Sequence, residues 1–386
     1  MHEILPLTEE QLEIQALARE FAREHIAPFA ADWDDRAHFE RSVIDRLGEL
    51  GFLGMLIPEE HEGLGLDTFS YLLALEEIAA ADASVAVAMS VHNSLPTQML
   101  LRWGTEAQQH EFLRPMARGE KLGAFALSEA EAGSDAAALR AQAVKEGDAW
   151  VLNGTKAWVS SGGQADVYLT MVRTDSPDHR RGARGISAFI LTPDLPGFGI
   201  GRKEDKMGLR ASPTTDLVFD GLRVPADRLL GEEGSGFVYA MQSLDNGRLG
   251  IAAQAIGIAR AALEHATAYA NERHQFRKPL RDLQAIQFKL ADMALRVTAS
   301  RALLWATATA KDRGVRATQF GSMAKLLASE SAMWVTNQAV QIFGGYGYMK
   351  EYPVEKLLRD AKVTEIYEGT SEIQRIVIAR ELYSHL

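Results

Sequence analysis

The spacing of apolar residues changes twice along this 386-residue chain, from a helical period to a period of two and back again. Thr8 and Gln11 make a capping box that predicts the start of a first helix. The glycine-rich, acidic stretch 59–67 is expected to be a loop. Further helices are predicted in the first third over about residues 42–50, 68–81, 84–101 and 106–118.

Alternation of apolar and polar residues begins near Gly123 and predicts strands. Asn153-Gly154 is the pair that most favours a two-residue turn, so we predict a hairpin between 149–152 and 156–160. Other strands are predicted over 167–172, 186–192 and 215–219. Long helical segments then return at 237–271, 284–313 and 317–343, and shorter ones at 353–362 and 371–385.

This order of periods predicts an α+β protein with three domains. We place an N-terminal α-helical domain at residues 1–121 and a middle antiparallel β domain at 122–232. A C-terminal four-helix-bundle domain is placed at 233–386. Hydrophobic residues make up 47% of the chain, which is enough for a substantial core.

Composition excludes several classes of function. The net charge of −11 argues against a nucleic-acid surface. The chain has no cysteine, which excludes thiolate ligands and disulfides and fits a reducing cytoplasm. We expect no secretory signal, because the first residues have neither a basic nor an apolar region. No membrane span is expected either, because the most apolar run, Gly250–Leu263, is interrupted by Gln254 and Arg260.

Several common catalytic motifs are missing from the sequence. No G-x-G-x-x-G follows a predicted strand and opens a helix, so a Rossmann dinucleotide site is not supported. The chain also has no P-loop, no G-x-S-x-G and no H-E-x-x-H. Nucleotide hydrolysis, serine hydrolysis and zinc-dependent proteolysis therefore lack their motifs, and we predict no metal site.

The most informative segment runs from residue 364 to 375 and contains a carboxylate, Glu368, in a turn before the last predicted helix. Gly369 allows the backbone to turn tightly. Ser371 is predicted to be the N-cap, with Gln374 as its capping-box partner. A carboxylate held between apolar neighbours has a raised pKa, which suits a general base. The alternative is an exposed glutamate before an ordinary helix.

Other segments suggest ligand contacts, and each has a structural alternative. Phe125–Asp135 has small and hydroxyl residues that suit a polar ring edge or a phosphate, or form an ordinary turn. The indole of Trp158 would suit stacking on a planar cofactor, and the alternative is that Trp158 lies in the core. The glycines of Gln341–Gly347 would let the backbone approach a ligand closely, and the alternative is that they cap a helix. Arg273 would reach a phosphate or stabilise a helix end. Asp245–Arg248 would bind a ligand or form an intrahelical pair.

Together and in this order, these segments resemble the acyl-CoA dehydrogenase family over essentially the whole chain, and its short-chain (butyryl-CoA type) members most. Two departures from the family pattern keep the chemistry intact. Ala130 stands where many members have proline, and Ser160 stands where threonine is common. The resemblance rests on Phe-Ala-Leu-Ser-Glu…Gly-Ser-Asp at 125–135, Trp158-Val159-Ser160, Asp245-Asn-Gly-Arg248, Arg273–Gln284, Gln341–Gly345 and Ile366–Arg375.

The resemblance implies FAD between the β domain and the C-terminal bundle, partly contacted across a subunit interface. It implies that Glu368 removes the proton α to the thioester carbonyl while a hydride leaves the β-carbon for flavin N5. Ser134, Asp245, Arg248 and Gly369 would contact acyl-CoA. An electron-transferring flavoprotein would be the acceptor, and the chain would form a homotetramer. The implied FAD contacts are Phe125, Leu127, Ser128, Gly133, Ser134, Trp158, Val159, Ser160, Arg273, Phe276, Gln284, Gln341, Gly344, Gly345, Thr370 and Glu372.

Two further features concern the reaction. Some relatives carry the base at the position of Gly247, which has no side chain here. Residues 83–89, which resemble the part of the family near the acyl pocket, contain no arginine to pair a second carboxylate, so we expect short to medium, straight, monocarboxylic acyl chains. The alternatives are a flavin oxidase or monooxygenase of the same superfamily, against which the intact 367–370 turn argues, and a non-catalytic helical interaction protein.

Overall fold

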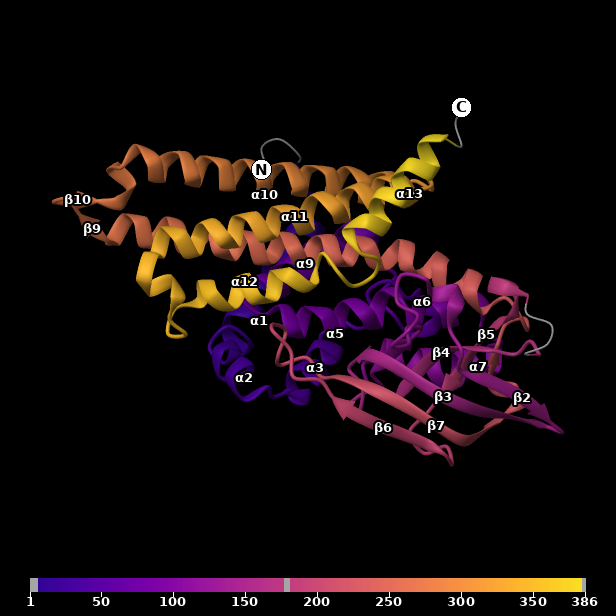
Figure 1. Ribbon diagram of the computed structural model, residues 1–386. Helices are drawn as coiled ribbons and strands as arrows, with labels where there is room; N and C mark the ends of the chain where they lie inside the picture. Colours follow the sequence, from indigo (N-terminus) through magenta and orange to yellow (C-terminus); the bar gives the residue numbers. More distant parts are fainter. Residues whose placement is uncertain (1–5, 177–180, 384–386) are drawn as a thin grey trace.

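The computed structural model describes residues 6–176 and 181–383, and its first part is a set of mostly short helices (Figure 1). The capping box predicted at Thr8 and Gln11 is present. Asp67 and Asp82 cap the two central helices, because each carboxylate accepts N–H groups of the following turn. The helices are α1 (Glu9–His25), α2 (Ala30–Arg36), α3 (Arg41–Glu49), α4 (Thr68–Ala81), α5 (Ala83–Ser94), α6 (Pro96–Trp103), α7 (Glu106–Gln108) and α8 (Arg114–Ala117).

Helices α4 and α5 are the buried centre of this part. Nearly every residue of α4 is buried, and α5 is buried along its whole length. A helix without a polar face must be covered on all sides. Helices α1, α9 and α10 cover α4, while α9 and the sheet cover α5.

The middle of the chain forms a twisted sheet whose described strands follow the order β6-β7-β3-β2-β4-β5-β8, with β1 beside β4. Most pairs are antiparallel, as predicted, but β1 and the end of β2 pair with β4 in parallel. β4 and β5 are buried along their whole length. The strands are β1 (Gly123–Ala126), β2 (Gln142–Glu146), β3 (Ala149–Ser160), β4 (Val167–Arg173), β5 (Ile186–Leu191), β6 (Phe198–Lys203), β7 (Thr214–Pro225) and β8 (Leu229–Leu230).

Three long helices lie side by side in the C-terminal part, with two shorter helices after them (Figure 1). Each long helix begins and ends within one residue of its predicted bounds. The order of helices, sheet and helices predicted from the sequence is confirmed, and the exact domain boundaries stay a prediction. The elements are α9 (Gly236–Glu272), β9 (His274–Gln275), β10 (Lys278–Pro279), α10 (Gln284–Asp312), α11 (Thr318–Phe343), α12 (Pro353–Val363) and α13 (Ser371–Tyr383).

The hairpin predicted at Asn153-Gly154 is wrong, because β3 runs through this pair without turning. Gly154 has a φ of 138° and lies at a shift of register against β7. A Cβ atom at this position would lie 2.7 Å from the Cα atom of Ala141. The glycine therefore serves a β-bulge and close packing. The turn that joins β2 to β3 lies at Gly147 instead, where φ is 65°.

Other boundaries differ from prediction for local reasons. The helix predicted over 84–101 is divided at Leu95, because Pro96 has no backbone N–H to continue the helical hydrogen bonds. The segment 106–118 contains a π-helical turn at Gln109–Leu113. The predicted loop 59–67 includes a short 3-10 turn. The last predicted helix extends to residue 385, of which residues 384 and 385 lie outside the described residues.

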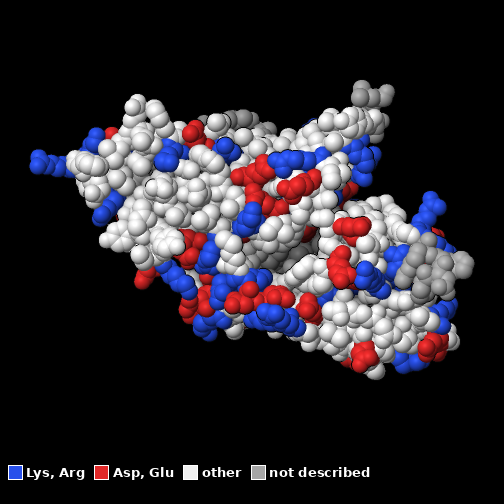
Figure 2. Space-filling model, viewed as in Figure 1, with Lys and Arg blue, Asp and Glu red and all other residues white. Residues whose placement is uncertain are grey.

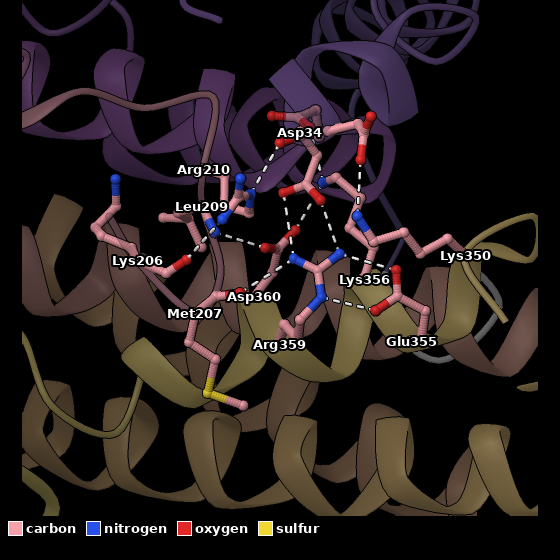
Figure 3. A network of polar contacts seen from close by, with 12 residues as sticks. Asp34, Lys206, Met207, Leu209, Arg210, Lys350, Glu355, Lys356, Arg359 and Asp360 are labelled. Carbon is pink, nitrogen blue, oxygen red and sulfur yellow. Dashed lines mark hydrogen bonds and ion pairs between the residues drawn. The ribbon is translucent and has the colours of Figure 1, made fainter. Parts of the chain in front are cut away.

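A network of charged side chains ties α12 to α2 and to the loop between β6 and β7 (Figure 3). The guanidinium of Arg359 donates to the carboxylates of Asp34 and Glu355, both at 2.7 Å, and to the carbonyl of Met207 at 3.1 Å. Arg210 in the same loop donates to the backbone carbonyl of Asp34 at 3.0 Å. The network therefore holds three parts of the chain together at one end of α12.

Lys356 makes a second, more buried part of the same network. Its ammonium group bonds to the carboxylates of Asp82 at 2.9 Å and Asp360 at 2.7 Å, and both carboxylates are fully buried. Asp360 also accepts the backbone N–H of Leu209 at 2.6 Å. Burial raises the pKa of Asp360, and the charge of Lys356 opposes that rise. One lysine thus neutralises carboxylates from two helices.

We predict that Lys356→Met strongly destabilises the protein. The substitution leaves Asp82 and Asp360 buried without a cation, and removing one partner of a buried pair typically costs about 3–5 kcal/mol. Chemical unfolding followed by circular dichroism measures the loss. Lys350→Met is the control, because Lys350 pairs with Asp35 at the exposed rim of the same network and should not change stability. Equal effects of the two substitutions would contradict the prediction.

Candidate active site

Glu368 lies in a tight turn between α12 and α13. The φ angles of Glu368 and Gly369 are 51° and 93°, so both residues have left-handed backbone. The side-chain amide of Gln374 donates to the carbonyls of Glu368 at 3.2 Å and Gly369 at 2.9 Å. A Cβ atom on Gly369 would lie 2.7 Å from that amide nitrogen. The turn therefore needs glycine at 369, and its hydrogen bonds hold Glu368 in an unusual conformation.

The predicted capping box at Ser371 is wrong by one residue. The hydroxyl of Thr370 accepts the backbone N–H of Ile373 at 3.3 Å, so Thr370 caps α13. The hydroxyl of Ser371 is buried and has no hydrogen-bond partner among the described residues. Gln374 does not act as a box partner, because its amide is already bonded to the two carbonyls of the turn.

The carboxylate of Glu368 is buried and has no hydrogen-bond partner in the described part of the chain. Burial raises its pKa to about 7, while the charges of Lys325 and Arg248 oppose the rise. The exposed-glutamate alternative therefore does not apply. A carboxylate with a pKa near neutrality, free of donors, can accept a proton from a bound molecule.

Helix α9 passes directly opposite this carboxylate. A Cβ atom at Gly247 would lie 2.1 Å from Oε2 of Glu368, so glycine leaves the space that the glutamate fills. The next residue, Arg248, donates to Asp245 at 2.6 Å, and Asp245 accepts the hydroxyl of Thr318 at 2.9 Å. The intrahelical pair that the spacing suggested is present, and Arg248 also lines the cavity beside Glu368.

Glu368 lies where two adjoining cavities of about 200 and 550 Å³ meet. The cavities lie between the β domain and the C-terminal helices, and Figure 2 shows the surface hollowed between these parts. Predicted residues that line one or both of them are Phe125, Leu127, Ser128, Gly133, Ser134, Trp158, Ser160, Arg248, Glu368, Gly369 and Thr370. The fold thus brings these predicted site residues together around the two cavities beside Glu368.

Trp158 forms part of the wall that faces Glu368. Its side chain is 52% exposed and its φ is 58°, so the core alternative is excluded. The hydroxyls of Ser128, Ser134 and Ser160 line the same wall. Val159 differs from its neighbours, because its side chain is buried in the core and does not line either cavity.

The walls of the smaller cavity are mainly apolar. Val91 and Leu95 contribute from one side, and Met241 and Leu244 contribute from α9. One turn beyond Gly247, helix α9 packs so closely on α5 that a Cβ atom on Gly250 would lie 2.4 Å from the hydroxyl of Ser90. The smaller cavity therefore has little depth between α5 and α9 on the side below Glu368.

Most of the remaining predicted residues lie apart from Glu368. Arg273, Gly344 and Gly345 line a separate cavity of about 440 Å³. It lies at the end of the bundle marked by β9 and β10, away from the sheet (Figure 1). Gly344, with a φ of 63°, also caps α11. Phe276, Gln284 and Gln341 are exposed at this end, and Glu372 is exposed on α13. Glu372 lies beside the turn, in the first turn of α13, whereas one chain does not bring the other residues of this group to Glu368.

Sequence reasoning missed Lys325 and the loop 206–209. Lys325 is buried in α11, and its ammonium group donates to the carbonyl of Gly369 at 2.8 Å. A lysine within the apolar pattern of a long helix is a signal that could have been noticed. Loop 206–209 lines the larger cavity and had no local pattern that pointed to a site.

Among residues 6–176 and 181–383, no three His, Asp or Glu side chains are grouped so as to hold a metal ion. No helix in the same residues has the length and apolar character needed to cross a membrane.

Comparison with known proteins agrees with this geometry. Sequence models for the N-terminal, middle and C-terminal domains of acyl-CoA dehydrogenase match residues 8–120, 124–222 and 234–383. The mitochondrial short-chain specific acyl-CoA dehydrogenase of Rattus norvegicus is 49% identical, over 98% of this chain and 90% of that protein.

Solved structures are similar over nearly the full length. Butyryl-CoA dehydrogenase from Megasphaera elsdenii matches with a TM-score of 0.96 and 46% identity, over 98% of this chain and 99% of that chain. A structure described as an electron transferring flavoprotein of Acidaminococcus fermentans matches with a TM-score of 0.96 and 45% identity, over the same shares. The chain therefore belongs to the acyl-CoA dehydrogenase family, whose members are FAD-dependent oxidoreductases.

Proposed function

We propose that this acyl-CoA dehydrogenase converts short- to medium-chain, straight acyl-CoA to trans-2-enoyl-CoA, with Glu368 as the base that removes the α proton. The observation that supports this most is the carboxylate itself. It is buried, has no hydrogen-bond partner among the described residues, faces a cavity and has a pKa of about 7. A base of this strength is partly ionised at neutral pH and gains a proton readily once a substrate covers it.

The larger cavity fits a flavin ring. The exposed indole of Trp158 offers a flat apolar wall, and the hydroxyls of Ser128, Ser134 and Ser160 lie beside it. Thr370 lines the same cavity, near Glu368. We propose that these residues hold FAD together with Phe125, Leu127, Gly133 and the backbone of Val159.

When bound, FAD supplies the acceptor for the hydride that leaves the β-carbon of the substrate. The protein's own residues do the rest of the chemistry that we propose. Glu368 takes the α proton, and its backbone N–H donates to the thioester carbonyl, so that the charge developing on that oxygen is stabilised. Ser134, Asp245, Arg248 and Gly369 contact the acyl-CoA, and Asp245 also holds Arg248 in place.

A second copy of the chain would complete the cofactor site. Arg273, Gly344 and Gly345 line a cavity at the far end of the bundle and cannot reach the turn of their own chain. We propose that they contact FAD across a subunit interface with Phe276, Gln284 and Gln341, and that Glu372, which follows the turn on α13, also contacts FAD. Apolar side chains exposed on the long helices, such as Phe288, Leu295 and Phe320, are suited to be buried in a homotetramer.

We propose an electron-transferring flavoprotein as the electron acceptor, which is consistent with the family and with the solved structure of that description. Cytoplasmic location stays a prediction from the cysteine-free sequence. The oxidase and monooxygenase alternatives gain no support, because the turn that positions Glu368 is intact.

We predict that Glu368→Gln keeps FAD and butyryl-CoA binding but loses most turnover. An amide cannot take up the α proton, and loss of a general base typically lowers the rate by about 10² to 10⁴. Anaerobic bleaching of the flavin by butyryl-CoA measures the effect. Glu365→Gln is the control, because its carboxylate lies in the same turn but pairs with Lys362. Near wild-type bleaching in Glu368→Gln would refute the role of the base.

We predict that Gly247→Glu restores part of the activity of Glu368→Gly. A side chain at 247 points into the space of the lost carboxylate, since its Cβ atom would lie 2.1 Å from Oε2 of Glu368. In the wild-type background, the same substitution should lower activity because the two side chains collide. Steady-state turnover of the single and double variants measures both effects. A double variant no more active than Glu368→Gly would show that the two positions do not serve one site.

We predict that kcat/KM is highest for butyryl- or hexanoyl-CoA and low for palmitoyl-CoA and glutaryl-CoA. The cavity beside Glu368 is apolar and has little depth between α5 and α9. No arginine occurs in 83–89 to pair a second carboxylate. Assays with an artificial electron acceptor give the profile. Glutaryl-CoA turnover equal to that of butyryl-CoA would contradict the expectation that the acyl pocket does not accept a second carboxylate.

A further inference from the structure

Lys325 is a buried lysine directly behind the turn that carries Glu368. Its exposed fraction is 0%, although it is a cationic residue in the middle of α11. Its ammonium group donates to the carbonyl of Gly369 at 2.8 Å. Burial of a charged group costs free energy unless the group has partners. We therefore expect Lys325 to have a function or a compensating contact.

Lys325 lacks the compensation that the other buried cations of this region have. Arg248 is neutralised by Asp245 at 2.6 Å, and Lys356 is neutralised by Asp82 and Asp360. Among the described residues, no carboxylate lies within 4.0 Å of the Lys325 ammonium group. The negative charge that acts most strongly on it is that of Glu368.

The groups around the Glu368 carboxylate come from four places. The charges of Lys325 on α11 and Arg248 on α9 act on this carboxylate, and its own charge acts on Tyr71 of α4 and on Tyr367 of the turn. The two tyrosines stay neutral, because burial raises the pKa of each above the ordinary value. Only the two cations can favour the ionised carboxylate, and the effect of Lys325 is the larger.

We propose that Lys325 is a positioning residue for the base, whose buried ammonium group fixes the turn at Gly369 and keeps positive charge beside the Glu368 carboxylate. This inference rests on the proposed role of Glu368 as base. The two effects have separate physical origins. The hydrogen bond restrains the left-handed turn, which Gln374 also holds. The charge favours the ionised carboxylate in a site that excludes water.

The direction of the charge effect follows from the sign of the interaction. Burial raises the pKa of Glu368 to about 7 even with both cations present. Removing the positive charge of Lys325 raises this pKa further, so a smaller fraction of the base is ionised at neutral pH. The acid limb of the pH–rate profile therefore moves to higher pH. A lysine that only fills space would leave that limb where it is.

The test compares three substitutions at this position in the FAD-loaded protein. Lys325→Met removes the hydrogen bond and the charge, Lys325→Gln keeps an N–H donor without the charge, and Lys325→Arg keeps the charge. Lys311→Met is the control, because Lys311 is a partly buried lysine on another helix that bonds to the hydroxyl of Thr68. The readouts are the pH dependence of anaerobic flavin bleaching and the infrared titration of the carboxyl band that disappears in Glu368→Gln.

We expect Lys325→Met and Lys325→Gln to shift both titrations upward by about one pH unit, which is a tenfold change in the ionised fraction at a given acid pH. Lys325→Arg and Lys311→Met should titrate like the wild type. Unshifted titrations in Lys325→Met and Lys325→Gln would overturn the proposal. Failure of both variants to fold would overturn it too, because Lys325 would then be a structural residue.

The infrared titration separates this proposal from the proposed function. It reports the protonation of Glu368 without turnover. If Glu368→Gln retained turnover but the band still shifted in Lys325→Met, the base assignment would fail and the electrostatic effect of Lys325 would stand. If Glu368→Gln lost turnover and the band did not shift, only the inference about Lys325 would fail.

Discussion

The carboxylate of Glu368 is held out of water without a hydrogen-bond donor from residues 6–176 or 181–383, and much of the surrounding structure makes that possible. An isolated buried charge is costly, so the protein must restrain the group and moderate its pKa. The left-handed turn at Glu368 and Gly369 restrains the backbone. Gly247 leaves room on α9, and the cations of Arg248 and Lys325 moderate the pKa. The result is a carboxylate with a pKa of about 7, which suits its proposed role as the base.

The position of the turn depends on α12, and α12 depends on its charged contacts. Arg359 joins it to α2 and to the loop after β6, and Lys356 joins it to the cap of α5 through Asp82 (Figure 3). These contacts connect the N-terminal helices, the β domain and the C-terminal helices at one place. Because the chain runs from α12 straight into the turn, the same network sets where Glu368 meets the wall that carries Trp158.

The proposed cofactor site is divided between two ends of the molecule. The wall of Trp158 and Ser160 lies beside Glu368, whereas Arg273 and Gly345 line a cavity at the other end of the bundle. A single chain cannot bring both sets to one ligand. Assembly of subunits is therefore part of the proposed function, and the exposed apolar side chains of α10 and α11 provide surface for it.

The sequence by itself determined the order of helices, sheet and helices, the ends of the long helices and the family. Apolar period and capping residues are local properties, so the capping box at Thr8 and the bounds of α9 could be predicted. The turn at Glu368-Gly369 could also be predicted, because the glycine allows the positive φ that the turn needs.

Tertiary structure decided what depends on distant segments. Asn153-Gly154 became a bulge because β7 and Ala141 pack against it. Trp158 became a cavity wall, and Lys325 came to lie behind Gly369, because helices and strands far apart in the chain meet there. Burial and hydrogen-bond partners are created by packing, and no local pattern contains them.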